Sequence, residues 1–257
     1  MKGHFGEMIF ARAETAPFRS PDAPKTPLLT KNIKEYKLFG YLNFMEDRIM
    51  ENQVADGRLV VPYDKDKKTI IFYDTFVDMN GDVVKYDDIA IIESGALNSS
   101  SMIYFYFSKS FDYHFNFTTY DGTKHKFKRH GYAAYGIGTY KRIKAEYETV
   151  AEPMYNIVFS KVADRLIDRI ANGASVNIGG LTITKDQMSY TKRKQEHVID
   201  RTNFDRAIND KAYAQNYARI FVRGEKKAAF SLSLNEPNAR LLVPIVNHFF
   251  TYRPNQG

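Results

Sequence analysis

The sequence predicts an α+β fold in which two small β-rich modules are each followed by an amphipathic helix. The 257 residues include 19 Phe and 18 Tyr, a bias that suits half-buried strand surfaces. Runs of strand-like residues fill two separate stretches, and a helical pattern follows each of them. We expect an N-terminal arm over residues 1–57, a first module over 58–152, a linking helix over 153–173 and a second module over 174–257.

The N-terminal arm has two parts. Four prolines in a Ser/Thr/Ala setting predict extended chain over residues 11–30. Apolar residues at helical spacing predict a helix over residues 31–52, and Asp56-Gly57 ends that pattern.

The first module opens with strand-like runs, at 59–61, 69–77, 83–92, 102–107, 113–119 and 124–129. For the last pair, a three-residue turn at Tyr120-Asp121-Gly122 places Phe115 opposite Phe127. It also turns the three alternate lysines of the second strand outward, whereas a two-residue turn scatters apolar groups over both faces. We therefore predict a type I turn with Gly122 in the left-handed conformation at a bulge.

Residues 139–172 predict a long helix or a helix pair. Met154, Val158 and Val162 lie on one apolar stripe, and Pro153 either starts this helix or kinks a longer one. Asn172-Gly173 is a typical helix end.

The second module repeats the order of strands followed by a helix. Short strands are predicted at 176–178, 181–184, 188–190, 198–200, 219–222 and 228–234, and a helix at 236–251 with Asn235 or Glu236 as its cap. A weak repeat, Ile71-x-x-Asp74-x-Phe76 and Ile183-x-x-Asp186-x-Met188, accompanies this order.

Short motifs in the second module suggest a family. After the linking helix, residues 173–188 read Gly-Ala-Ser-Val-Asn-Ile-Gly-Gly-Leu-Thr-Ile-Thr-Lys-Asp-Gln-Met, a Gly followed by an apolar-Gly-x-Leu-x-Ile strand. With the Thr119–Gly122 turn and the Asn235–Ala239 helix start, this resembles a group of poorly characterised bacterial proteins with two tandem pleckstrin-homology-like (PH-like) modules. The resemblance covers roughly residues 58–257, although this chain lacks the Trp that the group often has. It implies two PH-like β-barrel or sandwich modules, each closed by a C-terminal helix, and it implies no chemistry.

The sequence offers little to catalysis. The absence of Cys excludes disulfides, thiolate nucleophiles and Cys-bound zinc. None of the six His has zinc-site spacing, and nucleophile-elbow, P-loop and kinase motifs are lacking. Asp87 and Asp88 would point to opposite faces of a regular strand. We therefore expect no catalytic residue, metal or cofactor, and neither a signal peptide nor a transmembrane segment.

Basic residues are the candidate ligand site of a chain with a net charge of +7. They are Lys124, Lys126, Lys128 and Arg129 along one strand, and Lys192, Arg193 and Lys194 in the second module. The competing interpretation is that edge lysines only block sheet-to-sheet aggregation.

We therefore predict a non-catalytic intracellular binding or scaffolding protein, in the cytoplasm or at the inner face of the membrane, whose partner is a protein or an anionic membrane surface. The alternatives are a nucleic-acid-binding protein, or an enzyme of unrecognised type that gathers residues such as His197, Asp200 and Asp205.

Overall fold

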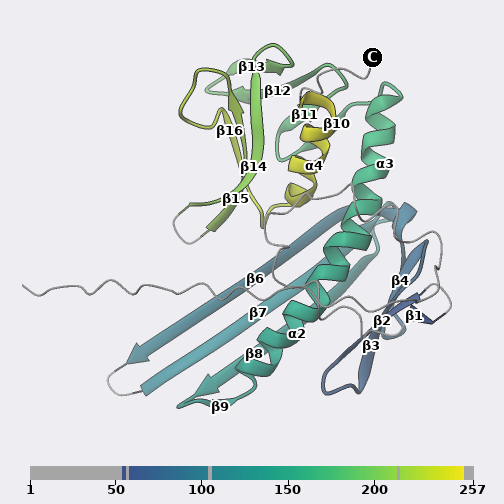
Figure 1. Ribbon diagram of the computed structural model, residues 1–257, viewed down its shortest axis with the longest axis vertical. Coiled ribbons are helices and arrows are strands. Elements are labelled where there is room, and N and C mark those ends of the chain that lie inside the picture. The colour runs from purple at the N-terminus through teal and green to yellow at the C-terminus, as the bar shows by residue number, and fades with distance from the viewer. Residues whose placement is uncertain (1–53, 56–57, 104–105, 213–214, 252–257) are drawn as a thin grey trace, which may run out of the picture. The chain divides into compact units, whose positions relative to one another are not determined.

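A computed structural model describes residues 54–55, 58–103, 106–212 and 215–251 (Figure 1). All of these described residues belong to one compact unit. The Pro-rich segment and the helix expected over residues 31–52 lie outside the described residues.

The predicted pair of PH-like barrels is wrong. The described strands form four separate antiparallel sheets, and none of these sheets closes into a barrel. Closure requires the last strand of a sheet to pair with its first. Here the chain leaves each sheet after a simple meander, and short turns at 86–88 and 201–203 divide the strands of each half between two sheets.

The first sheet is a five-stranded meander. Its strands are β1 (Val54–Ala55), β2 (Arg58–Tyr63), β3 (Lys68–Phe72), β4 (Phe76–Met79) and β5 (Val83–Lys85). The 3-10 turn η3 (Tyr86–Asp88) ends it, so the single strand predicted over 83–92 is interrupted. Asp87 and Asp88 are exposed in this turn and are not residues of a regular strand.

The second sheet contains the longest strands. It has the order β6 (Ile89–Ile103), β7 (Tyr106–Thr119), β8 (Lys124–Ala134) and β9 (Ile137–Gly138). The predicted β7–β8 register is confirmed, since Phe115 faces Phe127 and Gly122 has a φ of +86°.

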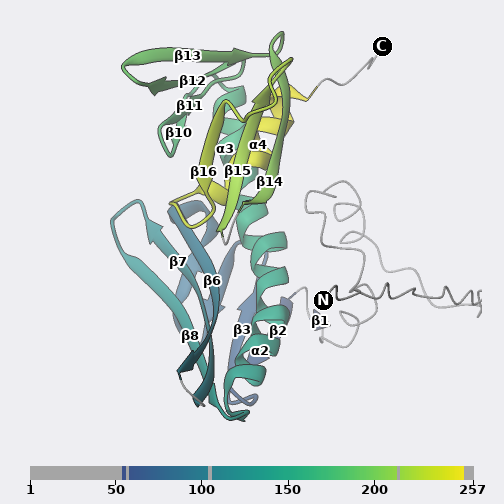
Figure 2. The ribbon, with the colours of Figure 1, turned by 90° about the vertical axis from the view of Figure 1, so that its left-hand side faces the viewer.

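One long helical segment follows, made of α2 (Tyr140–Pro153), the π-helical turn η4 (Met154–Phe159) and α3 (Ser160–Ala171). Pro153 therefore lies inside a longer helix. Because proline cannot donate the usual backbone hydrogen bond, the π-helical turn directly after it accommodates the irregularity. Figure 2 shows α2 beside β7 and β8, against which it packs. The helix ends at Asn172-Gly173 as predicted, with a φ of +89° at Gly173.

The C-terminal half contains two smaller sheets. They are β10 (Val176–Ile178), β11 (Leu181–Ile183), β12 (Gln187–Lys192) and β13 (Gln195–Asp200), then β14 (Phe204–Ala212), β15 (Gln215–Val222) and β16 (Phe230–Ser233). Strand β14 was not predicted, because its adjacent charged pairs at 205–206 and 210–211 obscure the strand pattern. The final helix, α4 (Ala239–Phe250), starts after Asn238 rather than after Asn235 or Glu236.

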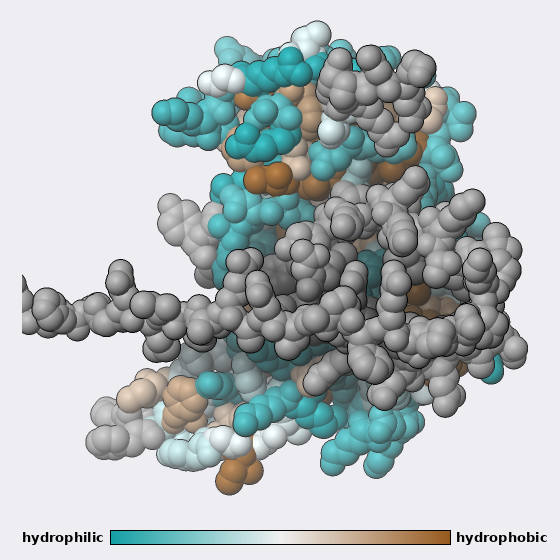
Figure 3. Space-filling model, in the orientation of Figure 1, coloured by the Kyte–Doolittle hydropathy of each residue, from teal (hydrophilic) through white to brown (hydrophobic). Residues whose placement is uncertain are grey.

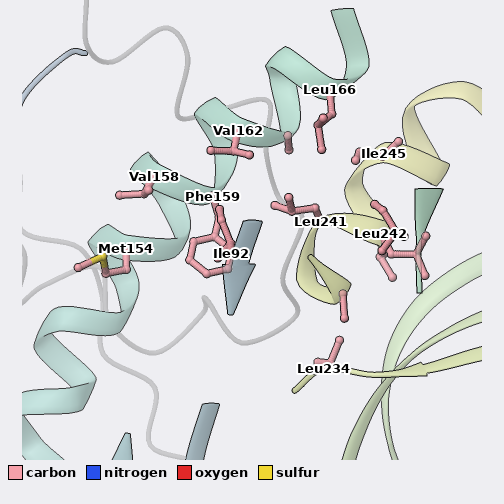
Figure 4. Packing of buried hydrophobic residues seen from close by; sticks show 14 of the residues in the cluster. Ile92, Met154, Val158, Phe159, Val162, Leu166, Leu234, Leu241, Leu242 and Ile245 are labelled. Atoms are coloured by element: carbon pink, nitrogen blue, oxygen red, sulfur yellow. The ribbon is translucent and has the colours of Figure 1, made fainter. Parts of the chain in front are cut away.

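The helices share one hydrophobic core with the sheets. Figure 4 shows Val162 and Leu166 of α3 near Leu241 and Ile245 of α4, with Phe159 beside Ile92 of β6. All of these side chains are buried. The core positions the second sheet, whose surfaces carry the candidate sites described next.

Candidate binding surface

The structure divides the seven predicted site residues among three places. Lys124, Lys126 and Lys128 are exposed on one face of β8, as predicted. Arg129 is the next residue along the strand and therefore points to the opposite, covered face. The remaining three residues lie in the exposed β12–β13 hairpin, where Arg193 and Lys194 form the turn with φ values of 53° and 67°.

Arg129 belongs to a partly buried ion cluster rather than to the lysine face. Its Nε donates to Glu146 Oε1 at 2.7 Å, and its Nη2 donates to Asp64 Oδ1 at 2.9 Å. Glu146 Oε1 also accepts a hydrogen bond from the Tyr113 hydroxyl at 2.8 Å, and Oε2 accepts one from the Asp64 backbone N–H at 3.0 Å. The cluster therefore ties α2 to β7, to β8 and to the β2–β3 turn.

Hydrogen bonds keep this cluster ionised. Burial alone would raise the pKa of Glu146, but the hydrogen bonds from Arg129, Asp64 and Tyr113 outweigh it and hold the pKa below the usual 4.5. The hydrogen bond from Arg129 likewise lowers the pKa of Asp64. A general acid or base needs a pKa near the working pH, so these carboxylates are suited to a structural role and not to proton transfer.

The lysine face is shallow and chemically mixed. Lys124 and Lys126 line a hollow of about 330 Å³ together with Ile91, Glu93 and Asn116. His114 lies beside Lys128, where burial lowers the pKa of its imidazole. Within the described ranges, no group of three His, Asp or Glu side chains is placed to hold a metal ion.

The three residues that an unrecognised enzyme could gather, His197, Asp200 and Asp205, each contact a different local partner. His197 stacks on Tyr190 with ring centroids 5.1 Å apart. Asp200 accepts hydrogen bonds from the Thr202 and Asn203 backbone within its own turn, and Asp205 pairs with the adjacent Arg206. These local partners account for the position of each side chain.

The two edges of the second sheet differ in character. Over residues 124–132, β8 has no second strand partner in the part of the chain that the structure describes, and this edge carries the three lysines. On the opposite edge, β7 is the one strand of the described residues that pairs with β6. We call residues 96–102 of β6 the open edge, because they are exposed and free of charged residues and proline.

The hydrogen bonds of Ile92 show which backbone groups face outward. Its N–H donates to Asn238 Oδ1 at 2.8 Å, and its carbonyl accepts from the Asn238 backbone N–H at 2.8 Å. These groups therefore point away from β7. In an antiparallel strand, the direction of the backbone N–H and carbonyl groups repeats every two residues. The same groups therefore point away from β7 at Ala96, Asn98, Ser100 and Met102. The ladder with β7 is regular from Ile91 to Ile103, and none of these four residues has an outward backbone partner among the described residues.

The open edge was not predicted, because the strands expected at 83–92 and 102–107 left the run Ser94-Gly-Ala-Leu-Asn-Ser-Ser-Ser between them. The strand continues there because β7 supplies a matching ladder. Ser99 and Ser110 are hydrogen bonded at 2.6 Å, and Ser101 and Ser108 at 3.0 Å. A complementary Ser-x-Ser run in both strands was the available signal.

A third surface lies at the far end of this sheet, where β6, β8 and β9 end in Figure 1. Large apolar and aromatic side chains are exposed here, including Ile137 at 81%, Met102 at 72% and Tyr135 at 65%. We define the apolar end as Met102, Tyr106, Phe107, Tyr132, Tyr135 and Ile137. Figure 3 shows apolar surface at the lower left and bottom, in the region where this sheet ends.

The apolar end is an ordered structure. The Tyr106 and Tyr135 rings meet edge to face with centroids 5.2 Å apart, and the hydroxyls of Tyr106 and Tyr132 are hydrogen bonded. The Tyr135 N–H donates to the Phe107 carbonyl at 3.1 Å, and the Thr139 N–H donates to the Tyr132 carbonyl at 2.7 Å. These contacts join the β8–β9 turn to β7 and to the start of α2.

No known protein family model matches the chain, and no curated protein matches it by sequence. Among the described residues, no helix is both long enough and apolar enough to span a bilayer. The lysine face, the open edge and the apolar end are therefore the features that bear on function.

Proposed function

We propose that this is a non-catalytic binding protein that takes up an extended segment of a partner protein as an additional strand on the open edge of β6. One observation carries the proposal: the exposed stretch from Ala96 to Met102 is a regular strand whose outward backbone groups pair with no other strand of the described residues. Strand addition to an exposed sheet edge is a recurring mode of peptide recognition.

The contrast between the two edges supports this choice. Natural proteins protect exposed edges with lysines, prolines or bulges. The β8 edge has Lys124, Lys126 and Lys128, which is one such protection. The open edge has none of these devices, although it belongs to the same sheet.

Backbone pairing would supply most of the affinity. Ala96, Asn98, Ser100 and Met102 each offer one outward N–H and one outward carbonyl. Each hydrogen bond formed with a partner strand contributes about 0.5–1.5 kcal/mol net. Side chains next to this edge are small except at Leu97 and Met102, so we expect the partner to be uncharged and to place apolar residues near these two positions.

Peptide selection followed by an edge-specific substitution tests the proposal. A random peptide library is selected on the wild-type protein, and the affinities of the selected peptides are then measured for two variants. Ser100→Pro removes one outward N–H, and edge strands tolerate proline where the N–H faces away from the sheet. Ser100→Thr is the matched control, because it keeps the N–H and the hydroxyl.

We expect Ser100→Pro to weaken peptide binding at least about tenfold, the equivalent of about 1.4 kcal/mol, while Ser100→Thr binds as the wild type does. Peptide binding should also slow amide hydrogen exchange in β6. Selected peptides that bind Ser100→Pro with unchanged affinity, or that leave exchange in β6 unchanged, would show that the open edge is not the site.

A further inference from the structure

We propose that the apolar end of the second sheet docks on an anionic membrane surface. This inference shares Met102 with the peptide site, but it concerns side chains at the end of the sheet rather than the backbone of its edge, so each can be tested without the other. It rests on two features of the same region, the exposed aromatic and aliphatic groups and the sign of the charges around them.

The apolar side chains suit the interface between lipid headgroups and acyl chains. Tyr106, Tyr132 and Tyr135 each combine an apolar ring with a polar hydroxyl, which is the character that enriches Tyr at membrane–water interfaces. Met102 and Ile137 are mostly exposed and offer purely apolar groups for insertion. Soluble surfaces seldom gather so many large apolar groups without a partner.

Among the described residues, the charges at the ends of these strands and at the start of α2 are positive, and the next acidic residues along these segments are Asp112 and Glu146. Residues 94–111 and 131–145 contain Lys109, Lys141, Arg142 and Lys144, and they contain no Asp or Glu. Arg142 pairs with Asp64, whereas Lys109, Lys141 and Lys144 are exposed. The Lys109 ammonium lies 5.2 Å from the ring centroid of Phe107 and 5.9 Å from that of Tyr140, so cation and aromatic groups form one surface.

This charge pattern favours a membrane over a second copy of the chain. Two copies meeting end to end would bring six exposed lysines together, whereas the exposed carboxylate of Glu148 lies one helical turn beyond Lys144, further from the end of the sheet. An anionic lipid surface attracts the same lysines. Apolar insertion combined with basic residues is the usual arrangement of reversible, interfacial membrane binding.

Vesicle co-sedimentation of the full chain tests the inference. The probes are vesicles of phosphatidylcholine mixed with phosphatidylglycerol, and vesicles of phosphatidylcholine alone. We expect binding to the anionic vesicles only, and weaker binding as salt is raised from about 0.1 M to about 1 M, because the Debye length falls from about 10 to about 3 Å.

Substitutions locate the docking surface. The double change Ile137→Ser and Tyr135→Asn removes two exposed apolar groups, and Asn tolerates the left-handed conformation of residue 135, where φ is 51°. Lys141→Gln with Lys144→Gln removes two charges. We expect each pair to weaken binding at least about tenfold. Val198→Ser and Lys192→Gln with Lys194→Gln, exposed positions on the β12–β13 hairpin, are matched controls that should bind as the wild type does.

Tryptophan fluorescence reports directly whether the apolar end enters the bilayer. Because the chain has no Trp, Ile137→Trp introduces a single indole that can be excited selectively over the tyrosines, and its emission should shift to shorter wavelength with anionic vesicles. The corresponding Val198→Trp variant should show no shift.

Three outcomes would overturn the inference. One is the absence of binding to anionic vesicles, or equal binding to phosphatidylcholine alone. Another is loss of binding by Lys124→Glu with Lys126→Glu while the end variants bind normally, which would assign binding to the lysine face. The third is self-association that Ile137→Ser abolishes without any vesicle binding. None of these results bears on peptide uptake at the open edge.

Discussion

The Glu146 carboxylate connects α2 to β7, to β8 and to the β2–β3 turn. Its carboxylate is almost fully buried and accepts hydrogen bonds from Arg129, Tyr113 and the Asp64 backbone. A carboxylate with a lower pKa in the folded than in the unfolded protein stabilises the fold above its unfolded pKa. That contribution disappears as the pH falls through the folded value. Glu146 and Asp64 both have lowered pKa values, so the cluster should be stabilising at neutral pH and lost in acid.

We predict that Glu146→Gln lowers the free energy of unfolding by about 3 kcal/mol at pH 7, because it leaves Arg129 without its main buried partner. The difference from the wild type should shrink as the pH is lowered below about 4.5, where Glu146 becomes protonated in the unfolded chain. Urea unfolding at a series of pH values measures both effects. Glu148→Gln, at an exposed position two residues further along α2, is the control and should change the free energy of unfolding little. A difference that persists unchanged to pH 3 would contradict an ionised Glu146.

The direction of a side chain could be predicted from the sequence where neighbouring residues alone determine it. The outward direction of Lys124, Lys126 and Lys128 follows from the two-residue period of a strand, and the structure confirms it. The same period places Arg129 on the other face, so grouping it with the lysines confused neighbours in sequence with neighbours in space. Glu146 could not be identified, because its partners Asp64 and Arg129 are 82 and 17 residues away.

At the scale of elements, the close approach of α2 to β8 depends on one glycine. A Cβ built on Gly131 would lie 2.7 Å from Ile143 Cβ and 3.2 Å from the Thr139 carbonyl oxygen. Real side chains do not approach so closely, and Ile143 is itself buried in the core. A glycine at this position of β8 therefore lets the helix lie directly on the sheet.

We predict that Gly131→Ala destabilises the protein by about 1–3 kcal/mol, the usual cost of overpacking, even though alanine suits a strand better than glycine. Thermal unfolding measures the effect. Lys128→Ala, on the exposed face of the same strand, should leave the midpoint nearly unchanged. If Gly131→Ala were neutral or stabilising, α2 would not be in tight contact with β8.

Elements were predictable where a pattern could be read within one segment. The β7–β8 turn, the helix from 140 to 171 and the final helix all have such patterns. Strand β6 was divided wrongly, because the serines of residues 99–101 become strand only through their partners on β7. The barrel prediction failed for the same reason. Whether a meander closes depends on pairing between its first and last strands, and no local pattern records that pairing.

At the scale of the whole described unit, several contacts connect the second sheet to the C-terminal half. Asn238, directly before α4, exchanges two hydrogen bonds with Ile92 of β6. Arg165 of α3 donates to the carbonyls of Tyr86 and Asp87 at 2.6 Å each and to that of Ile89, which fixes the turn between the first two sheets. The buried side chains of α3, α4 and β6 lie in one cluster (Figure 4). These connections predict that the described unit unfolds as one body.

Leu242→Ala tests that cooperativity, because Leu242 is fully buried in α4, far along the chain from the second sheet. We expect a loss of about 2–5 kcal/mol, since the substitution leaves a cavity in the core. In a cooperative unit, slow amides can exchange only through global unfolding, so their protection should fall equally in β7 and in β15. Hydrogen exchange followed by mass spectrometry measures the two strands separately. Ile208→Ala, a partly exposed position on β14, is the control and should change neither. If β15 lost protection while β7 kept that of the wild type, the two halves would unfold independently. The shared core would then be only a contact surface between two separately stable parts.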